Sequence, residues 1–209
     1  MSEIIIISPE TNYPDESAWV VKLFEAGLAR FHLRKPGMND AALSEYIQEI
    51  PSVWRTHIVL HQAYDLVNEF GLCGWHFKDD EEQLERAGYW QDERSDGQSI
   101  SGSVHRLGDL DSSLNQWDYL FLSPVFPSIS KDGYEPSWDS TQLTSALVEF
   151  KRVCTTPLYA LGGVEPSTIN RCSEMGFDGV ALLGAIWQSS NPLESFLKLS
   201  EAGTYSAIL

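Results

Sequence analysis

Two short apolar segments end in residue types that suit the binding of an anion. The segment at 118–122 leads into a loop that carries a lone lysine, Lys131. The segment at 156–161 ends in two glycines, Gly162 and Gly163, just before a predicted helix. A lysine supplies positive charge, and a glycine turn lets backbone N–H groups approach a ligand closely. If the two segments are neighbouring strands, these residues predict an anion-binding site.

The segments that must position these residues alternate between strand-like and helix-like patterns. Short apolar runs bounded by turn residues are typical of buried parallel strands. The expected strands are 3–8, 29–34, 57–60, 73–77, 98–103, 118–122, 156–161 and 178–183. Eight strand and helix pairs predict an α/β protein with a single-domain (β/α)₈ barrel over residues 1–209. The alternative, an open doubly wound sheet, usually has a glycine fingerprint after its first strand, and none is present.

Amphipathic segments between these strands predict the helices. The expected helices are 16–28, 40–50, 63–70, a short one ending by Gly88, 107–116, 141–151, 166–175 and one from 192 past 198. Residues 89–97 are expected to form a polar excursion.

The composition excludes several kinds of partner. The formal net charge is −16, with 14 basic against 30 acidic residues, which argues against nucleic acid and against an anionic membrane surface. No apolar run approaches the roughly 18 residues that a membrane helix needs. Three cysteines without metal-like spacing favour buried thiols in a reducing compartment, so we expect a cytoplasmic protein. A homo-oligomer is compatible with this composition.

The few cations tend to follow predicted strands, and in a (β/α)₈ barrel the ligand site lies at those carboxyl ends. The residues in such positions are Arg34, Lys35, Lys78, Arg106 and Lys131, together with His61, His76 and His105. Barrels that bind phosphate often use the loops after strands seven and eight. Those loops contain Gly162, Gly163, Gly184 and Ala185, which we expect to bind phosphate.

His61 and His76 fall on neighbouring strand ends and admit two interpretations. Imidazoles in such places can act as a general base or as transition-metal ligands. The sequence offers no third ligand at a recognisable spacing. Polar lining of the pocket is therefore the favoured interpretation.

Four segments resemble the motifs of thiamin phosphate synthases and their paralogues, the thiazole tautomerases. They read SGSVH, DYLFLSPVFPSISK, ALGGV and GFDGVALLGAIW, and the resemblance extends from about Ala29 to Leu199. It implies a (β/α)₈ enzyme that couples hydroxymethylpyrimidine diphosphate to thiazole phosphate and releases diphosphate. It also implies Mg²⁺ on the diphosphate, and phosphorylated pyrimidine and thiazole substrates as the small-molecule partners.

The resemblance assigns roles to individual residues. Arg34, Ser103 and Lys131 match positions that contact the diphosphate and are the expected catalytic residues, and Gly163 matches the glycine that binds thiazole phosphate. The remaining residues expected to contact substrate or phosphate are Lys35, His32, His61 and Gln62.

The chain also departs from these motifs. A Gln-x-Arg-x-Lys element reads His32-Leu33-Arg34-Lys35-Pro36, and an Asn-Asp pair that binds metal reads His61-Gln62. The second metal position falls near Glu81 and Asp80, which also suit a solvated helix start. Mg²⁺ needs only one or two carboxylates besides substrate oxygens, so a site there is conceivable.

The loop after the sixth expected strand distinguishes the two branches. Tautomerases have a histidine at this position. This chain has Pro124 there, and synthases usually have a proline as well. The leading hypothesis is therefore a synthase-like transferase. The alternatives are a diverged tautomerase-like enzyme that uses His61 or His76 for proton transfer, and a non-catalytic ligand-binding relative.

Overall fold

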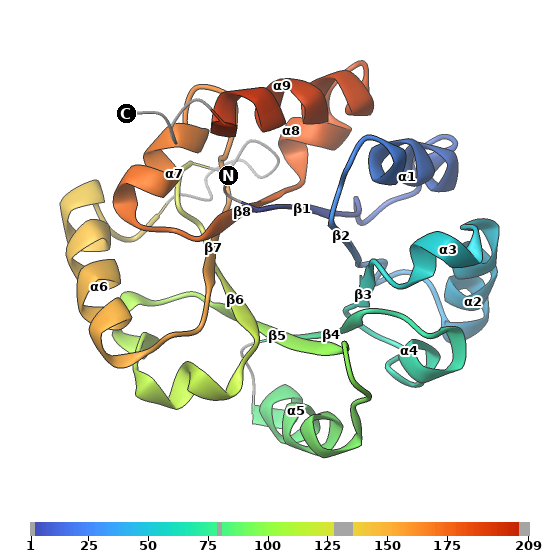
Figure 1. The fold of residues 1–209 in the computed structure, drawn as a ribbon, viewed down its shortest axis with the longest axis horizontal. Coiled ribbons are helices and arrows are strands. Elements are labelled where there is room, and N and C mark those ends of the chain that lie inside the picture. Colours follow the sequence, from blue (N-terminus) through green and yellow to red (C-terminus); the bar gives the residue numbers. More distant parts are fainter. Residues whose placement is uncertain (1–2, 79–80, 128–135, 205–209) are drawn as a thin grey trace.

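Eight parallel strands close into a barrel surrounded by helices (Figure 1). The computed structural model describes residues 3–78, 81–127 and 136–204, without the side chains of 81–86 and 204. The strands follow chain order around the ring, and β8 pairs with β1. They are β1 (Glu3–Ile7), β2 (Arg30–Leu33), β3 (Ile58–Leu60), β4 (Gly74–Phe77), β5 (Ser99–Val104), β6 (Tyr119–Leu122), β7 (Leu158–Leu161) and β8 (Gly179–Leu182). The predicted (β/α)₈ barrel is confirmed.

Helices cover the outside of the ring and differ from expectation in a few places. They are α1 (Glu16–Glu25), α2 (Asp40–Glu49), α3 (Ser52–Arg55), α4 (Asp65–Phe70), α5 (Glu81–Glu93), α6 (Ser140–Val153), α7 (Ile169–Met175), α8 (Gly184–Trp187) and α9 (Pro192–Thr204). The short helices α3 and α8 were not among the predicted helices.

Two predicted segments are wrong. Helix α5 does not end by Gly88 but runs to Glu93, because Trp90 stacks on Trp75 of the barrel at 5.1 Å and holds the helix against it. The expected helix at 107–116 is instead two 3₁₀ turns, η1 (Leu107–Asp109) and η2 (Ser112–Gln116). Asp111 is the N-cap of the second turn, because its side chain accepts a hydrogen bond from the N–H of Ser113.

Alternate side chains of each strand point to opposite sides of the ring, which gives two hydrophobic clusters. The larger one joins the outward residues of the strands to the helices. The smaller one fills the interior with Ile5, Ile7, Tyr119, Phe121, Tyr159 and Ala181, all from β1, β6, β7 and β8. The opposite side of the interior is polar, because His32, His76 and Ser101 are buried there on β2, β4 and β5.

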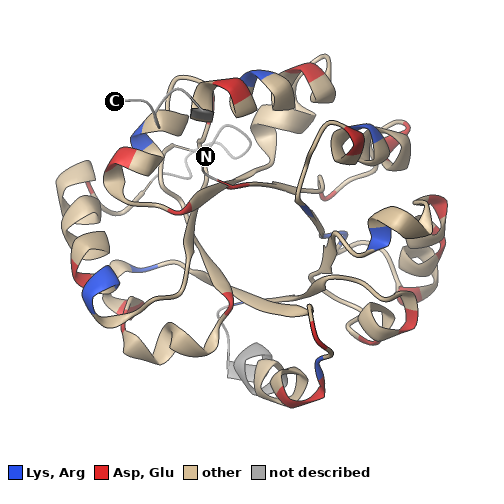
Figure 2. Cartoon of the chain, in the orientation of Figure 1, with Lys and Arg blue, Asp and Glu red and all other residues tan. Residues whose placement is uncertain are grey.

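Acidic side chains predominate on the outer helices. They lie on helices around the whole ring (Figure 2), and the formal net charge of the chain is −16. No described helix is long and apolar enough to cross a membrane.

The side chain of Lys35 is buried against α1 and does not line the cavity, where it was expected to bind phosphate. Its Nζ contacts Glu16 Oε2 at 2.6 Å and the carbonyl of Thr11 at 3.0 Å, and its side chain is 1% exposed. Glu16 also accepts a hydrogen bond from Tyr46 at 3.0 Å. Burial raises the pKa of Glu16, while Lys35 and Tyr46 oppose that rise. The ion pair ties α1 to the loop after β2, so the phosphate-binding role expected of Lys35 is incorrect.

Lys35→Met tests this structural role. Removing one partner of a buried ion pair leaves the other charge uncompensated, so we expect a loss of about 3–5 kcal/mol in the free energy of unfolding. Chemical denaturation measures it. The matched control is Lys198→Met, which breaks the exposed Lys198–Glu194 pair and should leave stability close to wild type. Equal stabilities of the two variants would contradict the assignment.

Candidate functional site

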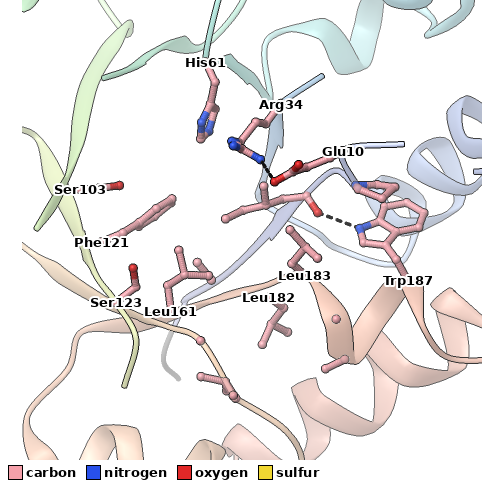
Figure 3. A pocket seen from close by; sticks show the side chains of 18 of the residues that line it. Glu10, Arg34, His61, Ser103, Phe121, Ser123, Leu161, Leu182, Leu183 and Trp187 are labelled. Carbon is pink, nitrogen blue, oxygen red and sulfur yellow. Dashed lines mark hydrogen bonds and ion pairs between the residues drawn. The ribbon is translucent and has the colours of Figure 1, made fainter. Parts of the chain in front are cut away.

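A cavity of about 640 Å³ opens at the carboxyl ends of the strands (Figure 3). Every strand contributes to its wall, either directly or through the residues that follow it. Among the predicted site residues, those that line the cavity are Arg34, His61, Ser103, Gly162, Gly163, Gly184 and Ala185. The structure therefore gathers the residues after β7 and β8 with an arginine and a serine from the opposite side of the ring.

The glycine turn after β7 packs tightly against the loop after β6. Gly162 and Gly163 have φ angles of 95° and 66°, a backbone conformation that side chains disfavour. A Cβ atom on Gly163 would lie 2.3 Å from the carbonyl oxygen of Pro127. Only glycine fits there, and the turn presents bare backbone to the cavity. Lys131, further along the same loop, lies outside the described residues.

Arg34 is held at the cavity mouth from two sides. Its N–H donates to Ser8 Oγ at 2.7 Å, and Ser8 Oγ donates back to the Arg34 carbonyl at 3.0 Å. Its guanidinium is ion-paired with Glu10, which also lines the cavity (Figure 3). Lys78, after β4, adds a second cation to the wall. Glu10 could not be recognised from sequence, because it follows β1 without a recognisable pattern.

Other predicted residues are not part of the wall. Gln62 turns away, because its Nε2 donates to the carbonyls of Lys35 at 2.8 Å and Met38 at 3.0 Å. His32 is fully buried below the cavity. Asp80 lies outside the described residues, and so does the side chain of Glu81.

Three histidines meet at the floor of the cavity. His32, His61 and His76 each place a ring nitrogen within 4.8 Å of the other two. His32 Nδ1 and His61 Nε2 share a hydrogen bond at 2.9 Å, and the rings of His61 and His76 stack at 4.2 Å. They come from β2, the end of β3, and β4, which are adjacent in the ring. No spacing in the sequence marks His32 as the third member, although all three occupy inward positions on, or directly after, successive strands.

These imidazoles are neutral. Burial lowers the pKa of His76 to about 3, with Arg34 and His105 adding to the effect. Burial also lowers the pKa values of His32 and His61 well below the usual range, and the neighbouring histidines contribute in the same direction.

Hydrogen bonds fix the tautomer of His76. Ser101 Oγ donates its single proton to the carbonyl of Trp75 at 3.1 Å, so it must accept from His76 Nδ1 at 2.9 Å. The proton of the neutral ring is thus on Nδ1, and Nε2 carries a lone pair. Ser103 Oγ lies 2.9 Å from that Nε2 and donates to it. His76 therefore orients the serine that was predicted to contact diphosphate.

Comparison with known proteins assigns the chain to a family. Residues 4–186 match the family described as thiamine monophosphate synthase. This chain belongs to that family. The thiamine-phosphate synthase of Anoxybacillus flavithermus is 26% identical over 194 residues, covering 90% of this chain and 86% of that protein.

Solved structures with the same fold agree. The thiamine phosphate pyrophosphorylase of Bacteroides thetaiotaomicron superposes with a TM-score of 0.77 at 23% identity, covering 97% of this chain and 98% of that one. The enzyme of that name from Pyrococcus furiosus has a TM-score of 0.78 at 17% identity and covers 98% and 96%. At these identities the likeness supports the barrel fold.

The described wall of the cavity does not fit the Mg²⁺ that the family implies. Mg²⁺ takes oxygen ligands, usually with one or two carboxylates. Among the described lining residues the only carboxylate is Glu10, and it is paired with Arg34. At the position expected for a metal carboxylate, Gln62 donates its amide protons to two carbonyls.

The neutral histidines make the fold sensitive to acid. An unfolded histidine titrates near pH 6.5, whereas folded His32 and His76 titrate well below it. Below pH 6.5 the unfolded chain therefore binds protons that the folded chain does not, and the free energy of unfolding falls with pH. Each of these two imidazoles contributes up to about 1.4 kcal/mol per pH unit. Denaturant titrations at and below pH 6.5 measure the slope, and an equal slope in His76→Gln would contradict this account.

Proposed function

We propose that the chain is a transferase of thiamin biosynthesis that joins hydroxymethylpyrimidine diphosphate to thiazole phosphate and releases diphosphate. The observation that carries the proposal is the cavity itself. It places two glycine-containing turns opposite Arg34 and Lys78 at the mouth of an otherwise acidic barrel. Family membership supplies the identity of the phosphorylated substrates.

The two sides of the cavity bind the two substrates. The thiazole phosphate binds to backbone N–H groups of two turns. One turn contains Gly162 and Gly163, and the other contains Gly184 and Ala185. Arg34, with Lys78 nearby, takes the diphosphate. The guanidinium has five donors in a planar fork, so Arg34 can keep Glu10 and still bind phosphate oxygens.

Electrostatics then favours cleavage of the pyrimidine–diphosphate bond. The bond between the pyrimidine CH₂ and the diphosphate oxygen breaks, and its electron pair leaves with diphosphate. Arg34 and Lys131 stabilise this growing negative charge more in the transition state than in the ground state. The thiazole nitrogen lone pair captures the CH₂ cation. Phe121, Leu161 and Leu182 in the wall keep water away from it.

Magnesium is not needed to describe these protein contacts. A magnesium site in this chain has to draw on Asp80 and Glu81, as the sequence suggests, together with diphosphate oxygens. The proposal therefore assigns no magnesium ligand to the described wall.

The tautomerase-like alternative is less well supported. A general base works best when its pKa lies near the working pH. Burial takes the pKa values of His61 and His76 far below neutrality, so both are weak bases.

Arg34→Met tests the diphosphate site. We expect kcat/KM for thiamin phosphate formation to fall about 100-fold, because one charged contact to the leaving group is lost. The assay follows thiamin phosphate and diphosphate with both precursors and Mg²⁺ present. The matched control is Arg106→Met, which also follows a strand but pairs with Asp109 and does not line the cavity. No product from wild type, or equal rates in the two variants, would reject the proposal.

Lys131→Ala tests the second cation predicted for the leaving diphosphate. We expect turnover to fall strongly with little change in the circular dichroism spectrum. Lys151→Ala is the control, because Lys151 pairs with Asp178 at 2.8 Å and is not a lining residue. An unchanged rate in Lys131→Ala would remove this lysine from the mechanism.

A further inference from the structure

The transfer reaction proposed above uses the three histidines at the cavity floor only through the hydrogen bond from Ser103 to His76. We infer that His32, His61 and His76 form a binding site for one divalent first-row transition metal ion, with Zn²⁺ the best fit. The inference does not depend on the proposed reaction.

The geometry is close to that of a three-histidine site. Tetrahedral zinc with Zn–N bonds of about 2.0–2.1 Å holds its ligand nitrogens roughly 3.3 Å apart. His32 Nδ1 and His61 Nε2 are 2.9 Å apart, and all three ligand nitrogens lie within 4.8 Å of one another. The rings of His61 and His76 stack at 4.2 Å, so they must turn for their lone pairs to converge on one ion. The strands that carry them are neighbours, so the arrangement is built into the barrel.

Two of the other ring nitrogens, on His32 and His76, have the partners that a metal site requires. A histidine ligand usually donates its second N–H to a fixed acceptor, which orients the ring. His32 Nε2 lies 2.8 Å from the hydroxyl of Tyr119, and His76 Nδ1 donates to Ser101. His32 therefore offers Nδ1 to an ion at the floor. His76 offers Nε2, whose lone pair exchanges the hydrogen bond from Ser103 for the bond to the ion.

Binding needs no net loss of protons. All three rings are neutral, and each carries one N–H and one lone pair. In the hydrogen bond between His32 and His61, one proton occupies a nitrogen that faces the ion. That proton moves to the other nitrogen of the same ring, through exchange with water, and both lone pairs then face the ion.

The site keeps one side open. His61 and His76 line the cavity, while His32 closes the site from below. Three protein ligands with a fourth position open to a cavity are typical of zinc ions that bind water or a substrate oxygen. Neutral nitrogen donors favour Zn²⁺ and similar ions over Mg²⁺, which prefers oxygen. The inferred site thus differs in ligand type from the magnesium site implied by the family.

The test measures metal binding without substrate. Untagged protein is freed of metal with a chelator and titrated with Zn²⁺ in competition with a chromophoric chelator. We expect one Zn²⁺ per chain, and about 100-fold or more weaker binding in His61→Asn. Tyr119→Phe, which removes the partner of His32, should weaken binding about 10-fold. Co²⁺ should give the intense visible d–d bands of a tetrahedral site.

His57→Asn is the matched control. His57 lies outside the cluster, where its Nδ1 contacts the carbonyl of Ala29 at 2.8 Å, so this variant should bind Zn²⁺ like wild type. Absence of tight binding in wild type, or unchanged binding in His61→Asn, would overturn the inference. A cobalt–thiolate band would place the ion on a cysteine and would also overturn it. The wild-type Co²⁺ spectrum decides the matter even if a histidine variant does not fold.

Discussion

The polar half of the barrel interior depends on complete pairing of its buried side chains. A buried polar group without a partner costs about 1–3 kcal/mol, so a ring that places histidines and serines inside must supply each of them with a hydrogen bond. Here the chain of contacts runs from Tyr119 to His32 and on to His61, and from Trp75 through Ser101 to His76. Burial raises the pKa of Tyr119 to about 12, so its hydroxyl keeps its proton. The network holds Ser103 and the cavity floor in fixed positions.

The rim above this floor uses charge differently. Its cations work in a protein with a net charge of −16, where a diffuse positive field is impossible. The positive charge of Arg34 acts only at short range, because Glu10 holds the guanidinium at the mouth and partly neutralises it. An anionic substrate then meets an oriented donor fork and bare backbone amides. Lys35, one residue further, serves stability instead, and the two neighbouring cations have separate tasks on opposite sides of the strand end.

The sequence was sufficient for the barrel because its strands are short buried runs with clear breaks. It was also sufficient for the residues whose place follows from strand order, such as Arg34, Gly163 and Gly184. Prediction from the sequence failed where the direction of a side chain determines whether the residue lines the cavity. Lys35 follows a strand like Arg34 but points outward into a buried ion pair. Helix α5 passes through Gly88 because Trp75 stacks with Trp90, a contact between distant residues that local propensity cannot reveal.

The histidine cluster shows the same limit more sharply. His61 and His76 are separated by one helix, and two more helices lie between His32 and His61, so no spacing rule joins them. They come together because side chains alternate between the inside and the outside along each strand, and because the three strands are neighbours in the ring. His32 and His61 are also positions where the chain departs from motifs that it resembles, and they share a hydrogen bond at 2.9 Å. Because the two side chains are in direct contact, a change at either position alters the hydrogen bonding of the other. In that floor the buried side chains offer imidazole nitrogens, and their hydrogen bonds to one another, to Tyr119 and to Ser101 fix the orientation of the rings beneath the cations of the rim.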